Sequence, residues 1–283
     1  MTGHEPVMVA EVVELLGRGG RILDLTLGAG GHAEALLDAG ADTVIGIDRD
    51  PEAIGIAVER LSRYGVRFRA HAGRFSQIED DVVVGPVGGV LYDLGVSSMQ
   101  LDRAERGFSF RHDAPLDMRM GDEGPTAADL VNALPERELA DLIFRFGEER
   151  RSRRIAAAIV RRRPVHTTDE LAGIVVGAVG KRPGGPHPAR RTFQALRIAV
   201  NRELEELAAS LPRAVGLLEP GGRVVVISYH SLEDGLVKRC FRDDERLRVL
   251  TRKPTRPSPE ELARNPRARS ARLRAAERIG EAA

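Results

Sequence analysis

Apolar and polar positions along the first third of the chain predict an alternation of strands and helices. Short apolar runs that end in glycine, acidic or polar residues predict strands at 22–25, 43–47, 66–71 and 89–93. Between the strands, apolar residues spaced by three and four predict helices at 12–16, 33–39 and 51–64. This alternation predicts a doubly wound α/β domain with a mostly parallel sheet.

The pattern changes between about residues 101 and 202, where charged segments with helical spacing replace the strands. Helices are predicted at 135–146, 152–161, 168–180 and 192–211, and a strand pattern resumes at 221–228. An all-helical subdomain is therefore inserted into the sheet domain. We predict a discontinuous domain of residues 1–103 and 206–283, interrupted by a helical domain of residues 104–205.

A glycine-rich turn follows the first predicted strand, in the order Asp24-Leu-Thr-Leu-Gly28-Ala-Gly30-Gly31-His32. Glycine suits a sharp turn where the backbone approaches a ligand. Asp48 ends the next strand, about 20 residues after the first glycine, where a carboxylate can accept hydrogen bonds from both ribose hydroxyls. The arrangement predicts a cofactor of nucleotide type.

Two cofactors fit that turn, because Gly28-x-Gly30-x-x-Ala33 also satisfies the dinucleotide pattern of NAD enzymes. Asp24 favours S-adenosylmethionine, since its carboxylate attracts the sulfonium and ammonium groups of that molecule and repels a pyrophosphate. The structural alternative is that Asp24 caps the following helix and the glycines only form a tight turn.

Composition is that of an ordinary globular protein of 283 residues with a formal net charge of +1. The single cysteine, Cys240, excludes an intrachain disulfide, and no cysteine–histidine cluster has zinc spacing. We expect no metal in the cofactor pocket. The first residues do not resemble a signal peptide, and the longest apolar run, near 171–180, is too short to span a bilayer, so we expect a cytoplasmic protein.

Arginine and lysine are gathered in three segments, at 150–163, 181–197 and 252–278. Such clusters are typical of contact with a phosphate backbone. Neighbouring glutamates make solvated helix faces an alternative for the first two segments. RNA contact is the favoured interpretation for the tail at 252–278, where arginine outnumbers acidic residues.

The strand at 89–93 ends in Asp93, and strand ends of this kind face the ligand crevice of an open α/β sheet. A carboxylate there can accept a hydrogen bond from an exocyclic amine and direct its lone pair at a sulfonium. Phe75 follows the third strand, where its ring can stack on a purine; the alternative is a plain core phenylalanine.

Several longer blocks together resemble the ribosomal RNA small subunit methyltransferase H family, whose members methylate the N4 amine of a cytidine in the decoding region of 16S rRNA. The blocks include Asp24–His32, Asp93–Ser98, Arg106–Phe110, Pro115–Met120, Arg191–Arg197 and Ser228–Asp234, in order over nearly the whole chain. The resemblance implies a Rossmann-like S-adenosylmethionine methyltransferase acting on 16S rRNA or the 30S subunit.

The resemblance also implies site residues. The cofactor would contact Gly30, Gly31, His32, Asp48, Phe75, Asp93 and Gln100. The sequence after the fourth strand reads Asp93-Leu-Gly-Val96, without the Pro-Pro-aromatic block of many amine methyltransferases, so Asp93, Asp117, His112 and His230 are alternative partners of the amine. His230 has an equally good interpretation as a structural histidine.

The helical insertion is interpreted as a subdomain that recognises the RNA substrate. Two other functions fit parts of the pattern: an NAD-linked oxidoreductase, and a non-catalytic RNA-binding assembly factor that keeps the cofactor fold as a scaffold.

Overall fold

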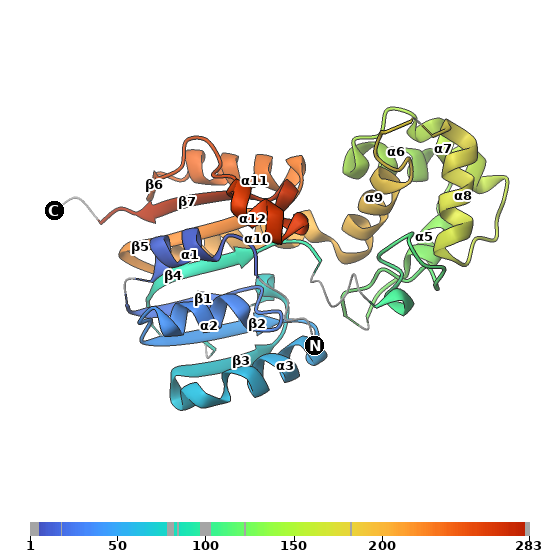
Figure 1. Cartoon of the computed structure of the whole chain (residues 1–283). Coiled ribbons are helices and arrows are strands. Elements are labelled where there is room, and N and C mark those ends of the chain that lie inside the picture. Colours follow the sequence, from blue (N-terminus) through green and yellow to red (C-terminus); the bar gives the residue numbers. More distant parts are fainter. Residues whose placement is uncertain are drawn as a thin grey trace. The chain divides into compact units, whose positions relative to one another are not determined.

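The structure is a computed structural model of the chain, and it describes residues 6–17, 19–77, 82–83, 85–96, 103–121, 123–181 and 183–280. The chain forms two compact units (Figure 1). The first combines Met1–Gly95 with Leu204–Ala283, and the second is Val96–Glu203.

The first unit is built on a seven-stranded sheet in the order β3-β2-β1-β4-β5-β7-β6. Its strands are β1 Arg21–Asp24, β2 Thr43–Asp48, β3 Phe68–Ala72, β4 Val87–Asp93, β5 Leu218–Ser228, β6 Leu247–Val249 and β7 Arg272–Arg278. Strands β1 to β5 pair in parallel, whereas β7 runs antiparallel to β5 and β6. The predicted doubly wound, mostly parallel sheet is confirmed. Strand order reverses between β1 and β4, which is where open α/β sheets bind ligands.

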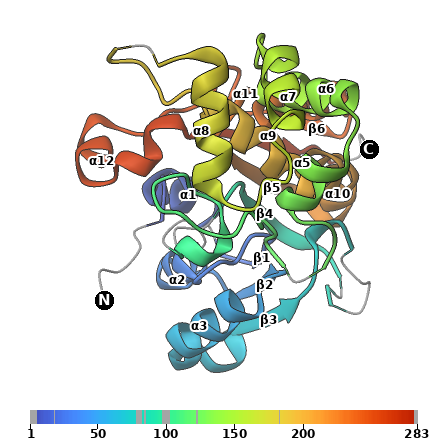
Figure 2. The same ribbon diagram turned by 90° about the vertical axis from the view of Figure 1, so that its right-hand side faces the viewer.

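Helices cover both faces of this sheet. They are α1 Val9–Leu16, α2 Gly31–Asp38, α3 Pro51–Leu61, α10 Glu203–Leu217, α11 Ser231–Asp243 and α12 Pro259–Arg264, with 3-10 turns η1 Ser62–Arg67, η2 Phe75–Gln77 and η4 Pro266–Ser270. Alternate residues of β5 point to opposite faces, as strand geometry requires. Val224 and Val226 join the core with α10 and α11, whereas Val225 and Ile227 join the core with α1 and α2. Helices α2 and α3 lie beside β2 and β3 (Figure 2).

The basic tail is partly built into this sheet, which corrects the expectation of an RNA-contacting segment for residues 272–278. Strand β7 occupies these residues, next to β5. Arg274 is 6% exposed, and its guanidinium donates hydrogen bonds of 2.6 and 3.2 Å to the Asp234 carboxylate of α11. Arg278 donates to the backbone carbonyls of Gly216 and Leu218. These arginines stabilise the first unit.

Replacing Arg274 with alanine should lower the free energy of unfolding by about 3 kcal/mol. The substitution removes the guanidinium that pairs with the mostly buried Asp234 carboxylate. Arg252, an exposed arginine of the same tail, is the matched control, and its alanine variant should lose less than about 0.5 kcal/mol. Chemical denaturation measures both. Equal, small losses would contradict the buried pairing of β7 with α11.

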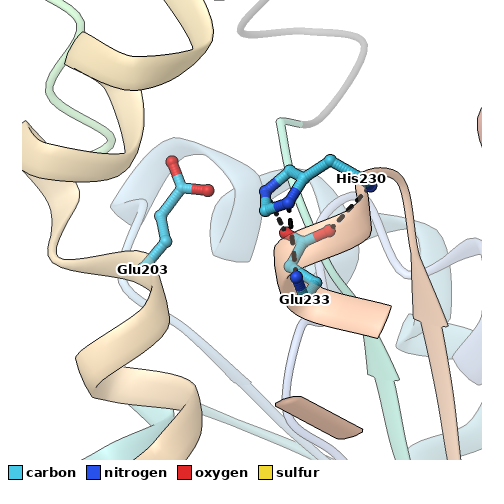
Figure 3. Close-up of side chains that lie close together, drawn as sticks. All are labelled: Glu203, His230 and Glu233. Atoms are coloured by element: carbon cyan, nitrogen blue, oxygen red, sulfur yellow. Dashed lines mark hydrogen bonds and ion pairs between the residues drawn. The ribbon is translucent and has the colours of Figure 1, made fainter. Parts of the chain in front are cut away.

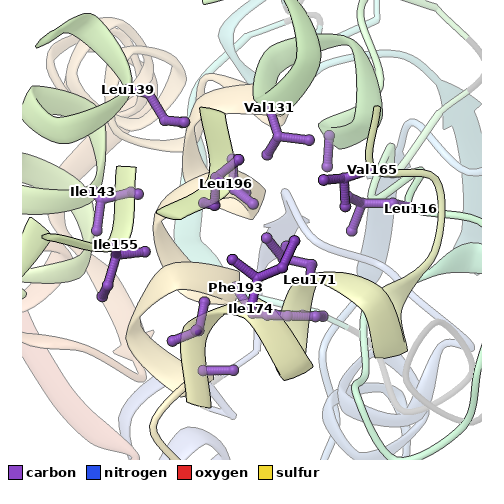
Figure 4. Packing of buried hydrophobic residues seen from close by; sticks show 14 of the residues in the cluster. Leu116, Val131, Leu139, Ile143, Ile155, Val165, Leu171, Ile174, Phe193 and Leu196 are labelled. Atoms are coloured by element: carbon purple, nitrogen blue, oxygen red, sulfur yellow. The ribbon is translucent and has the colours of Figure 1, made fainter. Parts of the chain in front are cut away.

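The second unit is helical, with α5 Ala127–Ala133, α6 Glu136–Gly147, α7 Ser152–Val160, α8 Thr168–Val179, α9 Arg190–Asn201 and the 3-10 turn η3 Ala104–Arg106. Apolar side chains from each of these α-helices share one core (Figure 4). Its members include Val131, Ile143, Ile155, Leu171 and Leu196, each fully buried. Helix α5 was not predicted, although Thr126 and Asp129 form a capping box at its start.

The predicted helix at 192–211 is wrong as a single element, because the structure divides it into α9 and α10. Arg202 adopts a left-handed conformation with φ 51° and ends α9. The Asn201 side chain donates 2.8 and 2.9 Å hydrogen bonds to the carbonyls of Met118 and Arg197. The break therefore depends on a contact with residues about 80 positions earlier in the chain.

Candidate cofactor site

Three carboxylates end three neighbouring strands of the first unit. Asp24 is the last residue of β1, Asp48 of β2 and Asp93 of β4. Because β1 pairs in parallel with both β2 and β4, their carboxyl ends share one edge of the sheet. Asp24 interacts electrostatically with both of the other carboxylates. The edge therefore carries a concentration of negative charge at the point where strand order reverses.

Asp24 is the most deeply buried of the three, with 1% of its surface exposed. Its Oδ1 accepts a 3.1 Å hydrogen bond from the Thr26 N–H. Its Oδ2 is buried and has no hydrogen-bond partner among the described residues. Burial raises the pKa of this carboxyl to about 6. A buried carboxylate oxygen without a donor is an acceptor available to a ligand.

His32 lies in the first turn of α2 and is 6% exposed. Its Nε2 is 3.4 Å from Asp93 Oδ2, which is ion-pair distance, but neither ring nitrogen makes a hydrogen bond of good geometry among the described residues. Burial opposes protonation, yet the Asp93 and Asp24 carboxylates outweigh it and raise the pKa of His32. The raised pKa favours a protonated imidazole beside this acidic edge.

Asp48 fastens the glycine turn to the end of β2. Its Oδ2 accepts a 2.8 Å hydrogen bond from the Gly28 N–H, and its Oδ1 accepts one of 2.9 Å from the Asp50 N–H. Burial raises the pKa of Asp48. Gly28 has φ 50°, and a Cβ placed there would find no atom nearer than 3.9 Å. Gly28 is therefore the glycine of this turn that borders open space.

Gly30 and Gly31 need to be glycine for a different physical reason. At Gly30, with φ 78°, an added Cβ would lie 2.9 Å from Leu61 Cδ1 of α3. At Gly31 it would lie 2.9 Å from Pro6 Cγ. Both glycines are required by close packing within the protein. The predicted contact of Gly30 and Gly31 with the cofactor stays a prediction. The structure adds a packing role that the sequence pattern did not reveal.

Phe75 lies in η2, directly after β3 and one strand from Asp48. Its ring packs edge-on against Tyr92, with centroids 5.7 Å apart and an interplanar angle of 82°. Its backbone carbonyl accepts a 3.1 Å hydrogen bond from the Ser210 hydroxyl. The side chain is only partly buried, which leaves ring surface for a ligand. Gln100, also predicted to contact the cofactor, lies outside the described residues.

Asp93 has partners that sequence reasoning did not identify. Its Oδ1 accepts a 2.8 Å hydrogen bond from the Tyr229 hydroxyl, and its backbone N–H donates to the Thr26 hydroxyl at 2.6 Å. The Asp93 side chain is 21% exposed. Tyr229 directly follows β5, the strand beside β4. Its position just beyond a central strand is the sequence feature that could have identified it as a site residue.

His230 forms the N-cap of α11 (Figure 3). Its Nδ1 accepts a 3.3 Å hydrogen bond from the Glu233 N–H, and its Nε2 lies 3.1 Å from Glu233 Oε1. The Glu233 carboxylate accepts from the N–H groups of Tyr229 and His230 at 2.9 and 3.3 Å. This reciprocal cap favours the structural alternative for His230. Glu203, also drawn in Figure 3, belongs to the helical unit and accepts two 2.8 Å hydrogen bonds from Arg197.

The two other candidates for the amine, Asp117 and His112, belong to the helical unit. The Asp117 carboxylate accepts hydrogen bonds of 2.8 and 2.7 Å from the Arg119 guanidinium. Partial burial opposes ionisation, but Arg119 outweighs it and lowers the pKa of Asp117, which makes this carboxylate a weak proton acceptor. His112 is exposed, and its carbonyl accepts from the Thr168 hydroxyl.

The helical unit also carries the first basic cluster on its surface. The side chains of five exposed arginines make neither a hydrogen bond nor an ion pair with any described residue: Arg150, Arg153, Arg154, Arg161 and Arg162. Phe144 of α6, the helix that packs against α7, is 56% exposed. Exposed guanidinium groups without ion pairs and exposed aromatic rings are both found on surfaces that bind single-stranded nucleic acid.

No helix among the described residues is long and apolar enough to cross a membrane.

Comparison with known proteins gives strong matches over nearly the whole chain. The sequence profile of the MraW methylase family matches residues 1–279. A protein of Dehalococcoides mccartyi named Ribosomal RNA small subunit methyltransferase H is 49% identical, and the match covers 98% of this chain and 87% of that protein. A protein of Synechococcus elongatus with the same name is 52% identical, covering 98% and 95%.

Solved structures are more distant. An rRNA methylase from Streptococcus thermophilus aligns with 99% of this chain and 99% of its own, at 13% identity and a TM-score of 0.48. The strand order of this chain, rather than that likeness, identifies its fold.

Proposed function

The chain belongs to the MraW methylase family, and we propose that it transfers a methyl group from S-adenosylmethionine to ribosomal RNA of the small subunit. The proposed acceptor is the N4 amine of a cytidine in the decoding region of 16S rRNA. The relatives named as small subunit rRNA methyltransferases, each about half identical, support the class of substrate.

One observation carries the choice of cofactor: the carboxylates of Asp24, Asp48 and Asp93 end adjacent strands, and Asp24 Oδ2 is buried without a donor among the described residues. Bound S-adenosylmethionine supplies a methyl group on a cationic sulfonium and carries an ammonium group. An acidic edge attracts both cations and would repel the pyrophosphate of a dinucleotide. These carboxylates therefore fit S-adenosylmethionine better than NAD and do not support a hydride-transfer enzyme.

Individual residues have distinct tasks in this proposal. Asp48 accepts hydrogen bonds from the ribose hydroxyls, and Phe75 contacts the adenine. Gly28 has no side chain, so the ligand can approach the backbone of the turn closely. Gly30 and Gly31 keep the turn close to the neighbouring elements, and Asp24 and His32 balance charge beneath it. Gln100 is retained as a proposed contact at the methionine end.

Asp93 is the proposed partner of the acceptor amine. A partly exposed carboxylate at the end of β4 can accept a hydrogen bond from the N4 amine and orient its lone pair. The amine becomes cationic as it is methylated and can then lose its proton to water, so Asp93 needs to orient the amine rather than to remove its proton early. The contacts of Asp117 and His230 leave both as weaker candidates for this task.

The helical unit is the proposed substrate-recognition subdomain. Its exposed arginines without ion pairs can neutralise phosphates of rRNA, and this electrostatic contribution to RNA affinity depends strongly on salt concentration. A cytidine within folded RNA must be unstacked before its amine can reach a methyl donor, and an exposed ring such as Phe144 offers a stacking surface for a displaced base.

The test is methyl transfer from isotopically labelled S-adenosylmethionine to 30S subunits and to naked 16S rRNA, both from cells that lack the modification. Nucleoside mass spectrometry locates the label, which should appear in N4-methylated cytidine. Label in another nucleoside would overturn the N4-cytidine assignment alone. Binding to RNA with no transfer to either acceptor would instead indicate the non-catalytic assembly factor.

A further inference from the structure

Tyr229 lies at the carboxyl end of the sheet, in the first position after β5. Its backbone N–H donates a 2.9 Å hydrogen bond to Glu233 Oε2, within the cap that starts α11. The backbone of Tyr229 is therefore held by the helix that follows it. His230, a candidate partner of the amine in the sequence analysis, and Glu233 together form this support.

The tyrosine side chain reaches across to the neighbouring strand. Its hydroxyl donates a 2.8 Å hydrogen bond to Asp93 Oδ1, and β4 and β5 pair directly at their carboxyl ends. Its ring packs over Gly95, which has φ 96°, and an added Cβ at that glycine would lie 3.4 Å from Tyr229 Cδ2. A Cβ at that distance is in ordinary van der Waals contact with the ring, and the positive φ of Gly95 strains any other residue at this position.

The Asp93 carboxylate thereby has a neighbour at each oxygen. Tyr229 binds Oδ1, and His32 Nε2 lies 3.4 Å from Oδ2. Burial and the negative charge of Asp93 raise the pKa of Tyr229 well above its usual range, so the hydroxyl remains a proton donor at any pH of an activity assay. A carboxylate has about four lone-pair sites, so acceptor capacity remains for a ligand after these two contacts.

We propose that Tyr229 is a positioning residue for methyl transfer, whose hydroxyl fixes the orientation of the Asp93 carboxylate toward the acceptor amine. This role rests on the proposed function. It acts on the transfer step through Asp93. Orientation within a fraction of an ångström is what such a hydrogen bond supplies, and errors of about 1 Å can cost up to about 100-fold in rate.

The first test replaces Tyr229 with phenylalanine, which keeps the ring over Gly95 and removes the hydroxyl. We expect kcat for methyl transfer to fall about tenfold or more, while the Kd for S-adenosylmethionine stays within about threefold. The matched control is Tyr64→Phe, which removes a hydroxyl that donates to the Asp38 carboxylate at 2.6 Å on the surface of the same unit. Thermal unfolding verifies that both variants fold.

The second test separates positioning from a general structural effect. If Tyr229 acts through Asp93, the double variant Tyr229→Phe with Asp93→Ala should be no slower than Asp93→Ala alone, measured by single-turnover transfer of labelled methyl groups. Independent, multiplying losses would overturn the proposal, as would unchanged kcat in Tyr229→Phe or a loss confined to cofactor Kd. An inactive wild-type protein would overturn the proposed function itself, whereas an active wild type with an equally active Tyr229→Phe overturns only the role of the tyrosine.

Discussion

Replacing Asp48 with alanine should weaken S-adenosylmethionine binding by about 100-fold or more and reduce methyl transfer accordingly. An ionised carboxylate that accepts from two ribose hydroxyls makes two charge-assisted hydrogen bonds, each worth about 1.5–3 kcal/mol, and every 1.4 kcal/mol is about tenfold in Kd. The variant also loses the acceptor that ties the Gly28 N–H to β2 at 2.8 Å. Binding is measured by isothermal titration calorimetry.

Asp42 provides the matched control for this experiment. It lies beside the opposite, amino end of β2, where its carboxylate accepts a 3.1 Å hydrogen bond from the Gly20 N–H, and it is exposed. Asp42→Ala should leave the Kd for S-adenosylmethionine within about twofold of the wild type. Equal affinities for the Asp48 and Asp42 variants would place the cofactor elsewhere.

Replacing Asp24 with asparagine should stabilise the protein without cofactor at pH 7 by up to about 2 kcal/mol, while weakening S-adenosylmethionine binding about tenfold. Burial raises the Asp24 pKa to about 6, above its value in the unfolded chain, so the folded state resists ionisation of this group. At neutral pH the carboxylate therefore destabilises the fold, yet it is retained at the proposed site of a cationic ligand.

The sign of the pH dependence follows from linkage. Between the unfolded pKa of about 4 and the folded pKa of about 6, the folded protein binds more protons at Asp24 than the unfolded chain does, so the contribution of this group falls as pH rises. The stability difference between Asp24→Asn and wild type should accordingly grow from pH 4 to pH 7. Urea denaturation at several pH values measures it, with Asp42→Asn as the exposed control. A difference independent of pH would contradict the burial of an ionisable Asp24.

The first five strands and the place of the cofactor turn were predictable from local pattern. Apolar runs separated by helical spacing specify βαβ units, and such units pack in one handedness, so the amino-acid order alone places the end of each strand and its acidic residue. Asp24, Asp48 and Asp93 were found in this way, because a residue at a strand end is fixed by its own segment.

Contacts between distant segments were not predictable by that route. The arginine-rich tail has the composition of an RNA-binding arm, yet 272–278 forms β7, because Arg274 finds Asp234 on α11 and β5 offers an unpaired edge. The division between α9 and α10 depends on Asn201 meeting the carbonyl of Met118. Neither partner is near in sequence, so local propensity contained no sign of either outcome.

The sequence by itself thus determined the fold class, the family and the acidic strand ends, since each depends on short-range pattern. Only the tertiary structure decided which polar groups act together. In the folded protein His230 caps helix α11, and the Tyr229 hydroxyl donates to Asp93. Close packing leaves no room for a side chain at Gly30 or Gly31. The physical reason is that hydrogen bonds and close packing depend on ångström distances between side chains, and those distances exist only once separate strands and helices have packed together.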